Sequence, residues 1–289
     1  MAAFQQLNSV DGVKIFTSAA CTGTMASLAP MLTDGNALFV SDVLSGAKLT
    51  GISQYIFRNW GSDINESRLF ADKIIQAGYK KVGVIYEETD YAKGIKINLD
   101  NFLKDSGITV MSESFPTGTT DVRTQLTKLK SEKLDILLIN PQTVTSAEVV
   151  LKQMEDLNFR PRLLVNDNVT ISKDLVMKHK DILDGALGAN YVAPSNSQTD
   201  LILKMYKDTY GQDCPQTTVC VETYDTIHLI AEALKVNGED VAKIRSYLNT
   251  VKYNGAGGEI SFDGNNDRNG AVYTLFIVKD GAVQIAQDQ

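Results

Sequence analysis

The run Lys81-Val82-Gly83-Val84-Ile85-Tyr86 determines the fold class of this chain, because it is short, apolar and rich in β-branched residues. These properties are typical of a strand that is buried on both faces. Similar runs follow at Ile136–Ile139 and Leu163–Val165, and the segments between them carry apolar residues at helical spacing. Strands that alternate with helices need crossover connections. The pattern therefore predicts an α/β fold whose parallel sheet is covered by helices on both faces.

The alternation extends toward both ends of the chain. Near the start, Val13–Thr17 and Ala37–Val40 are predicted strands on either side of a helix at Met25–Leu32. Toward the end we expect three more helices, followed by short antiparallel strands that are separated by Gly, Asn and Asp turns. The expected helices are Leu201–Tyr210, Thr217–Leu234 and Asp240–Leu248, and the expected strands are Glu259–Phe262, Val272–Val278 and Val283–Ile285.

Length and composition limit the possible functions. The 289 residues suggest two domains, and 43% hydrophobic residues are enough to fill their cores. Lys and Arg number 28 against 35 Asp and Glu, and the resulting net charge of −7 disfavours nucleic acid as a partner. No apolar run approaches the ~18 residues of a membrane helix. The first seven residues do not form a secretory signal, which indicates a cytoplasmic or an already trimmed chain.

Motifs of catalysis and cofactor binding are missing from the sequence. It has no phosphate-binding loop, no dinucleotide-binding glycine motif and no nucleophile elbow. His179 and His228 lie on predicted helices without a partner at metal spacing, so we interpret them as packed or solvated side chains. The segment from Asp263 to Gly270 resembles a calcium loop, but Arg268 stands where such a loop needs Gly. We therefore expect a turn there, and neither a cofactor nor a metal.

The three cysteines do not form a disulfide framework. Cys214 and Cys220 are close enough in sequence for a local bridge, although unpaired thiols are the favoured interpretation. Cys21 stands at a predicted helix start, where its thiol pKa would fall. No histidine lies near it in sequence to act as a base, so a hydrolase that uses Cys21 is disfavoured.

The loop Ser18–Thr24 joins the first predicted strand to the helix that follows. Its small side chains expose backbone N–H groups at a helix start, where a carboxylate would be held well, and three hydroxyls add further donors. A plain strand-to-helix turn with good capping residues explains the same sequence equally well.

Several short segments carry a resemblance to a known family. They are Tyr55–Arg58, Gly61–Asp63, Lys80–Tyr86, Asp90–Gly94, Thr119–Asp121, Leu126–Asp135, Thr223–Asp225 and Gly258–Asp263. In this order and spacing, across nearly the whole chain, they resemble the branched-chain amino acid-binding proteins of ABC transporters, which are type I periplasmic binding proteins.

The resemblance implies two α/β lobes, joined by three crossovers, with the ligand in the cleft between them. Lobe one would comprise residues 1–62 and 193–262, and lobe two residues 63–192 and 263–289, with crossovers near Ser62, Val192 and Phe262. The family begins with an additional βαβ unit and an export signal before the helix that corresponds to Ala2–Leu7. The chain is therefore expected to be a truncated member with an open sheet edge beside Val13–Thr17. This edge predicts self-association or low stability, unless the Ala2–Leu7 helix repacks over it.

The resemblance also assigns ligand contacts in lobe one. Thr22 and Gly23 match the loop that binds the ligand carboxylate. Val43 and Ser45 match a loop that offers a backbone carbonyl, an amide and a hydroxyl to the ligand. Trp60 follows the first crossover segment, and two roles stay open for it: a wall of the cleft, or packing at the hinge.

In lobe two, Tyr91 matches a tyrosine that closes over the ligand. Asp167 falls where the family places an acid against the ligand's ammonium group. Gln142 stands where several members have an aromatic wall, which makes a purely aliphatic ligand less secure.

These matches predict a binding protein and not an enzyme. It would capture an amino acid or a similar small polar ligand outside the cytoplasm and deliver it to an ABC permease of the inner membrane. A ligand-sensing domain of a regulatory or receptor system with the same fold is the alternative. A folded relic that no longer binds a ligand is also left open.

Overall fold

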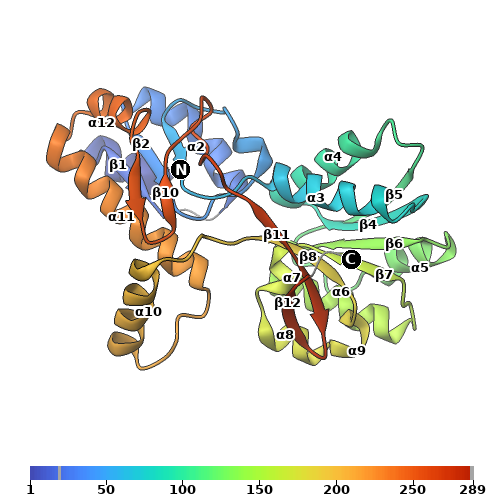
Figure 1. The fold of residues 1–289 in the computed structure, drawn as a ribbon. Coiled ribbons are helices and arrows are strands. Elements are labelled where there is room, and N and C mark those ends of the chain that lie inside the picture. The colour runs from blue at the N-terminus through green and yellow to red at the C-terminus, as the bar shows by residue number, and fades with distance from the viewer. Residues whose placement is uncertain (19–20, 287–289) are drawn as a thin grey trace. The chain divides into compact units, whose positions relative to one another are not determined.

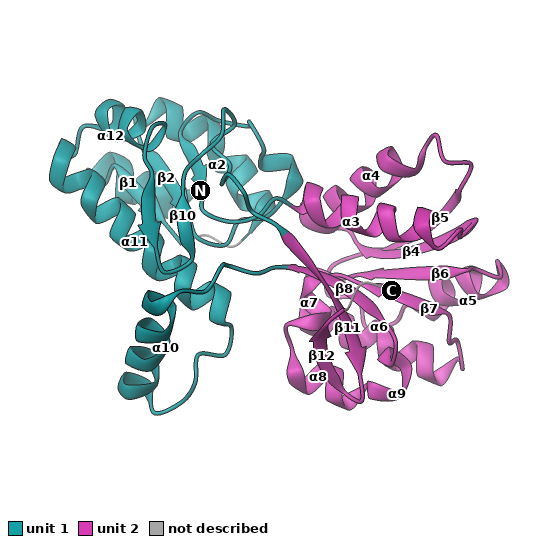
Figure 2. Ribbon diagram, in the orientation of Figure 1, with its two compact units in different colours: residues 1–62, 191–272 teal, residues 63–190, 273–289 magenta. Residues whose placement is uncertain are grey.

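The computed structural model describes residues 1–18 and 21–286, which form two compact units (Figures 1 and 2). Unit 1 comprises Met1–Ser62 and Tyr191–Val272, and unit 2 comprises Asp63–Asn190 and Tyr273–Gln289. The chain thus passes between the units after Ser62, Asn190 and Val272. Within the described residues, no helix is both long and apolar enough to span a membrane.

Unit 1 is built on a parallel sheet with the strand order β1-β2-β3, and a separate antiparallel hairpin joins β9 to β10. Its strands are β1 (Ile15–Thr17), β2 (Leu38–Ser41), β3 (Ile56–Arg58), β9 (Tyr253–Gly255) and β10 (Gly258–Ile260). Its helices are α1 (Ala2–Gln5), the π-helical turn η1 (Gln6–Val10), α2 (Thr22–Asp34), the 3₁₀ turn η2 (Ala47–Leu49), α10 (Ser197–Tyr210), α11 (Thr217–Asn237) and α12 (Val241–Leu248).

The core of unit 1 follows the two-residue period of β2, all of whose residues are buried. Leu38 and Val40 point to one face, where they pack with residues of α11 and α12. Phe39 points to the other face and packs with residues of α1 and α2. The three-stranded sheet is therefore covered on both faces, as the alternation of strands and helices predicted.

Unit 2 holds a seven-stranded sheet with the strand order β12-β11-β8-β7-β6-β4-β5. Its strands are β4 (Lys81–Glu87), β5 (Thr109–Phe115), β6 (Ile136–Asn140), β7 (Arg162–Val165), β8 (Leu187–Tyr191), β11 (Tyr273–Lys279) and β12 (Ala282–Ile285). Its helices are α3 (Asp63–Gln76), α4 (Asp90–Leu103), α5 (Arg123–Ser131), α6 (Val144–Asp156), α7 (Asp167–Thr170), α8 (Lys173–Lys178) and α9 (Lys180–Leu183). The strands from β5 to β8 pair in parallel, and β11 pairs with β12 antiparallel. The α/β fold with mostly parallel sheets is confirmed.

The third passage between the units lies later than expected. We predicted a crossover near Phe262, but residues 263–272 belong to unit 1. Two ion pairs hold this segment there. The buried Arg58 guanidinium donates to both carboxylate oxygens of Asp267, each at 2.6 Å, and Arg268 pairs with the buried Glu222 of α11. The segment therefore packs with β3 and α11 before the chain leaves unit 1.

The state of two cysteines also differs from the sequence interpretation. Cys214 and Cys220 form a disulfide, with their Cα atoms 6.7 Å apart. Because α11 begins at Thr217, its first turn carries Cys220 back toward Cys214. The interpretation of both residues as unpaired thiols was therefore wrong.

The start of the chain packs on the first strand of unit 1. Phe4 of α1 is buried, and its ring centroid lies 4.9 Å from that of Phe16 in β1. Beyond it, Leu7 and Val10 are exposed, and β1 stands at one end of the strand order. Self-association through this edge stays a prediction.

Candidate functional site

Three of the predicted ligand residues lie at one edge of the unit 2 sheet. Tyr91, Gln142 and Asp167 each follow the carboxyl end of a strand, and the three strands β4, β6 and β7 are neighbours. Because parallel strands end at the same edge, the topology brings these residues together. This edge is also where ligands bind in parallel α/β sheets.

Tyr91 and Asp167 are in direct contact. The Thr89 side chain caps α4 by accepting a hydrogen bond from the Ala92 backbone at 3.2 Å, which places the buried Tyr91 in the first turn. Its hydroxyl donates a hydrogen bond to Asp167 Oδ1. Burial raises the pKa of Asp167, whereas the hydrogen bond from Tyr91 lowers it. Burial, and then the charge of Asp167, raise the pKa of Tyr91 well above its usual value.

Two asparagines hold the loops that carry these residues. Asn166 Nδ2 donates to Asn140 Oδ1 at 2.9 Å and to the Pro141 carbonyl at 2.7 Å. Asn140 Nδ2 in turn donates to the Ala92 carbonyl at 2.8 Å. Since both asparagines are fully buried, these bonds fix the ends of β6 and β7 against the start of α4.

Gln142 lies in the same loop region as these asparagines. Its backbone N–H donates to Glu87 Oε2 at 2.8 Å, and its side chain is half-buried. An amide therefore stands at the strand edge where the resemblance places an aromatic wall in several family members.

Two further acids beside Asp167 were not predicted. Asp63 and Glu66 occupy the first turn of α3, and both are fully buried. The Tyr273 hydroxyl donates to Asp63 Oδ1 at 3.0 Å. Neither carboxylate oxygen of Glu66 has a hydrogen-bond partner among the described residues. Burial raises the pKa of Glu66 well above its usual value, and the charges of Asp167 and Asp63 raise it further. The sequence signal was an acid pair three residues apart, directly after the expected first crossover.

In unit 1, Thr22 and Gly23 form the first turn of α2, after β1. The Thr22 side chain is buried, and it lies so close to Gly46 that a Cβ at Gly46 would be 2.3 Å from Thr22 Oγ1. The Gly23 carbonyl accepts a hydrogen bond from Ser27 Oγ at 3.0 Å. Residues 19 and 20 of the expected carboxylate-binding loop lie outside the described residues.

Val43 and Ser45 follow β2, in a turn that Ser41 organises. The Ser41 hydroxyl oxygen accepts the backbone N–H groups of Val43 and Leu44, at 3.2 and 3.0 Å. Val43 is half-buried and Ser45 is buried. Thr22 follows β1 and this turn follows the neighbouring strand β2, so the predicted ligand residues of unit 1 also share one sheet edge.

Asp42, in the same turn, was not predicted. Its carboxylate is buried, and Oδ2 accepts a hydrogen bond from Thr223 Oγ1 at 2.6 Å. Oδ1 has no hydrogen-bond partner within the described part of the chain. The negative charge of Asp42 thus lies next to Val43.

Trp60 packs at the passages between the units. Its ring centroid lies 5.1 Å from that of Tyr191, in an edge-on arrangement. The Tyr191 hydroxyl and the Asn59 side chain each donate to Glu222 at 2.8 Å, and Arg268 forms an ion pair with the same carboxylate. Burial raises the pKa of Glu222 to about 7, against the lowering effect of Arg268. The ring contact with Tyr191 favours a packing role for Trp60.

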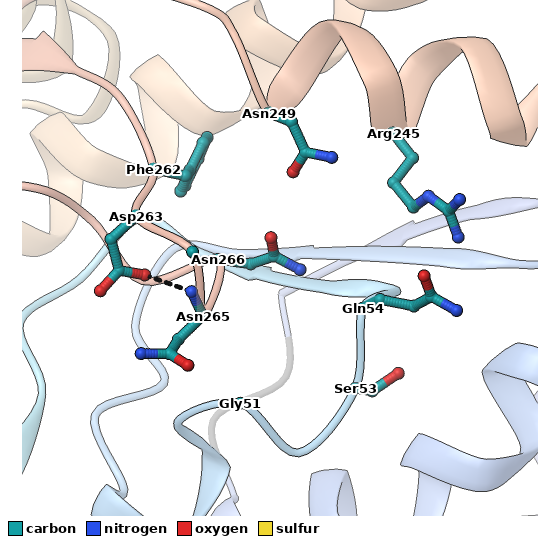
Figure 3. Close-up of a pocket in the computed structure, with 10 residues that line it drawn as sticks. Gly51, Ser53, Gln54, Arg245, Asn249, Phe262, Asp263, Asn265 and Asn266 are labelled. Carbon is teal, nitrogen blue, oxygen red and sulfur yellow. Dashed lines mark hydrogen bonds between the residues drawn. The ribbon is translucent and has the colours of Figure 1, made fainter.

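Unit 1 also carries a polar cavity of about 490 Å³ (Figure 3). The turn at 263–266, the segment around Gln54 and the end of α12 form its walls. The guanidinium carbon of Arg245 lies 5.0 Å from the centroid of the Tyr55 ring. None of the ligand residues predicted from the sequence is among the residues that line this cavity.

The two histidines and Asp263, which were considered as metal ligands, make contacts that stabilise the fold. His179 is buried, with Nδ1 3.1 Å from Glu155 Oε1, and His228 stacks on Tyr224. Asp263 Oδ1 accepts two backbone N–H groups of its own turn. In the described ranges, no group of three or more His, Cys, Asp or Glu residues is arranged to hold a metal ion.

Comparison with known proteins identifies the family of this chain. The family described as periplasmic binding protein matches residues 1–282. A Leu/Ile/Val-binding protein homolog of Brucella melitensis is 28% identical over 201 residues, which is 64% of this chain and 49% of the relative. The chain thus spans about half the length of the curated relatives it matches.

Solved structures share the fold at low sequence identity. A leucine-binding protein from Thermotoga maritima superposes with a TM-score of 0.86 at 22% identity, over 99% of this chain and 82% of the other. A solute-binding protein from Rhodopseudomonas palustris, in complex with p-hydroxybenzoic acid, gives a TM-score of 0.84 at 17% identity. That match covers 100% of this chain and 81% of the other.

Proposed function

Because this chain belongs to the periplasmic binding protein family, we propose that it captures an amino acid and delivers it to an ABC permease. The observation that carries the proposal is the contact between Tyr91 and Asp167 at the carboxyl ends of β4 and β7. An ammonium group beside Asp167 would form a charge-assisted hydrogen bond, which is worth roughly 1.5–3 kcal/mol where water is excluded.

Unit 1 would contribute the groups that bind the ligand carboxylate. The first N–H groups of α2 have no partner within the helix, and the Thr22 hydroxyl adds a donor beside them. Val43 and Ser45 would supply backbone and hydroxyl contacts. A zwitterion satisfies both kinds of group, since its carboxylate suits α2 and its ammonium suits Asp167.

The acids favour an amino acid over an aromatic acid as the ligand. The solved relatives include a leucine-binding protein and a p-hydroxybenzoic acid complex, so the fold alone does not decide between them. Asp63, Glu66 and Asp167 place three carboxyl groups together in unit 2. An anionic ligand without an ammonium group would add a fourth carboxyl group, whose negative charge these acids would repel. The polar Gln142 further favours a ligand that is not purely aliphatic.

The proposed role is that of a binding protein outside the cytoplasm, without catalysis. The family and the fold are those of solute-binding proteins. The Cys214–Cys220 disulfide supports an oxidising compartment, because disulfides persist in the periplasm and on cell surfaces.

Isothermal titration with each of the twenty common amino acids, and with p-hydroxybenzoate, tests the proposal. We expect one or a few amino acids to bind and p-hydroxybenzoate to give no heat. Binding of p-hydroxybenzoate alone would contradict the assignment of the ligand class.

A further inference from the structure

We propose that Glu66 sets the specificity of this site for a cationic amino group, by holding a proton in the ligand-free protein and releasing it when that group binds beside Asp167. This inference rests on the proposed function, because it takes an amino acid as the ligand. It adds that binding of the amino acid releases a proton from Glu66.

The geometry begins with three carboxyl groups from two helices. Asp63 and Glu66 lie on the first turn of α3, and Asp167 begins α7. Two tyrosines face them: Tyr91 from α4 and Tyr273 from β11. Glu66 contributes to the raised pKa of both tyrosines, so all five groups lie within electrostatic reach of one another.

The tyrosines distinguish the three acids. Asp167 accepts a hydrogen bond from Tyr91 and Asp63 accepts one from Tyr273, and such bonds stabilise a carboxylate anion. Glu66 receives neither, and no side chain among the described residues donates to its oxygens; the Asp167 backbone N–H is the one neighbouring group that favours its ionised form. An ionised carboxylate without a partner is costly to bury, and its two acidic neighbours increase that cost. Glu66 is therefore the acid that keeps its proton.

Among the residues that the structure describes, no basic side chain lowers the pKa of Glu66. The groups that act on the pKa of Glu66 are, in order, burial, the charge of Asp167, the charge of Asp63 and the Asp167 backbone N–H. Only the last lowers it. The compensating positive charge must therefore be a proton or come with a ligand.

A bound ammonium group supplies that charge. When it lies beside Asp167, its field stabilises the ionised form of Glu66, and the proton passes to solvent. The carboxylic acid and the free ammonium ion become a carboxylate, a bound ammonium ion and one released proton. By linkage, affinity then rises with pH by up to about tenfold per unit, between the pKa values of Glu66 in the complex and in the free protein.

Infrared difference spectroscopy at neutral pH tests whether Glu66 holds a proton in the ligand-free protein. The spectrum of the wild-type protein minus that of Glu66→Gln should contain the C=O band of a protonated carboxylic acid. Glu222 is common to both proteins, so its contribution cancels. As a control, the spectrum of the wild-type protein minus that of Glu148→Gln should lack this band, because Lys178 lowers the pKa of the half-buried Glu148 and keeps it ionised.

L-Leucine then serves as the ligand probe. Saturating leucine should remove the band from the wild-type protein, and titrations in buffers of different ionisation enthalpy should show up to one proton released per leucine. Glu66→Gln should bind leucine without proton release and without the pH dependence. A ligand-free protein that lacks the band, or a leucine complex that keeps it, overturns the inference. Failure of all twenty common amino acids to bind, leucine included, overturns the amino acid function together with the release step, whereas the band still decides whether Glu66 holds the proton.

Discussion

The Tyr91 hydroxyl donates a hydrogen bond to Asp167 Oδ1, and this bond joins the first turn of α4 to the first residue of α7. The two strands that precede these helices, β4 and β7, are separated by β6 in the sheet. The bond therefore spans the ends of three strands and fixes the direction of the Asp167 carboxylate. A carboxylate that is already oriented loses less entropy when it binds an ammonium group.

Gly46→Ala should weaken amino acid binding. The new Cβ would lie 2.3 Å from Thr22 Oγ1 and 2.4 Å from Cγ2, so Thr22 must shift at the start of α2. A displacement of this size costs about tenfold or more in affinity if Thr22 contacts the ligand. Gly264→Ala is the matched control, because its Cβ would meet no atom within 4 Å. Equal affinities of the two variants in isothermal titration would contradict the role of Thr22.

Arg268→Met should destabilise unit 1. It leaves the Glu222 carboxylate buried without its charged partner, and breaking a buried ion pair costs about 3–5 kcal/mol. Arg123→Met is the control, since its ion pairs with Asp121 and Asp156 are exposed and contribute little. Urea unfolding at pH 8, above the Glu222 pKa of about 7, measures both variants with this carboxylate ionised. A loss no larger than that of Arg123→Met would show that the pair does not anchor the 263–272 segment.

The free energy of unfolding should fall as pH rises above about 4.5, the ordinary pKa of a glutamate. The folded protein keeps protons on Glu66 and Glu222 that the unfolded chain has lost, so a rise in pH favours unfolding. For Glu222 the decrease ends near pH 7, its pKa in the folded protein. Chemical denaturation from pH 5 to 8 measures the slope, and Glu66→Gln should reduce it. An equal slope in that variant would mean that Glu66 is ionised.

Self-association through unit 1 is expected, because β1 stands at one end of its sheet and the nearby Leu7 and Val10 are exposed. Sedimentation velocity over a hundredfold range of concentration tests this expectation. Leu7→Lys together with Val10→Lys should weaken the association. A wild-type protein that stays monomeric with a sharp thermal transition would instead mean that α1 covers the edge sufficiently.

Local sequence patterns predicted the strands that support the site. Residues 81–86, 136–139 and 163–165 are continuous apolar runs, because β4, β6 and β7 are buried on both faces, and this signal needs no tertiary information. By contrast, Leu187–Tyr191 was not predicted as a strand. It contains Gly, Ala and Asn, and it owes its strand conformation to its neighbour β7.

Features that depend on contacts between residues distant in the chain could not be predicted from the sequence. The acids of unit 2 meet because α3, α7 and β11 converge, and Asp63 and Tyr273 are 210 residues apart. The third crossover was misplaced for the same reason, since the ion pair that holds residues 263–272 joins Arg58 to Asp267 across 209 residues. The disulfide depended on the first turn of α11, where a spacing of six residues alone is ambiguous.

Amino acid binding to the wild-type protein and to Asp167→Asn, compared by isothermal titration, tests the central claim most directly. We predict that an amino acid binds the wild-type protein and that Asp167→Asn loses about 100-fold or more in affinity, since the ammonium group keeps a buried charge without its partner. Tyr91→Phe, which keeps the carboxylate but removes its hydrogen bond, should lose less. An amino acid that binds wild-type protein and Asp167→Asn equally well would contradict the account.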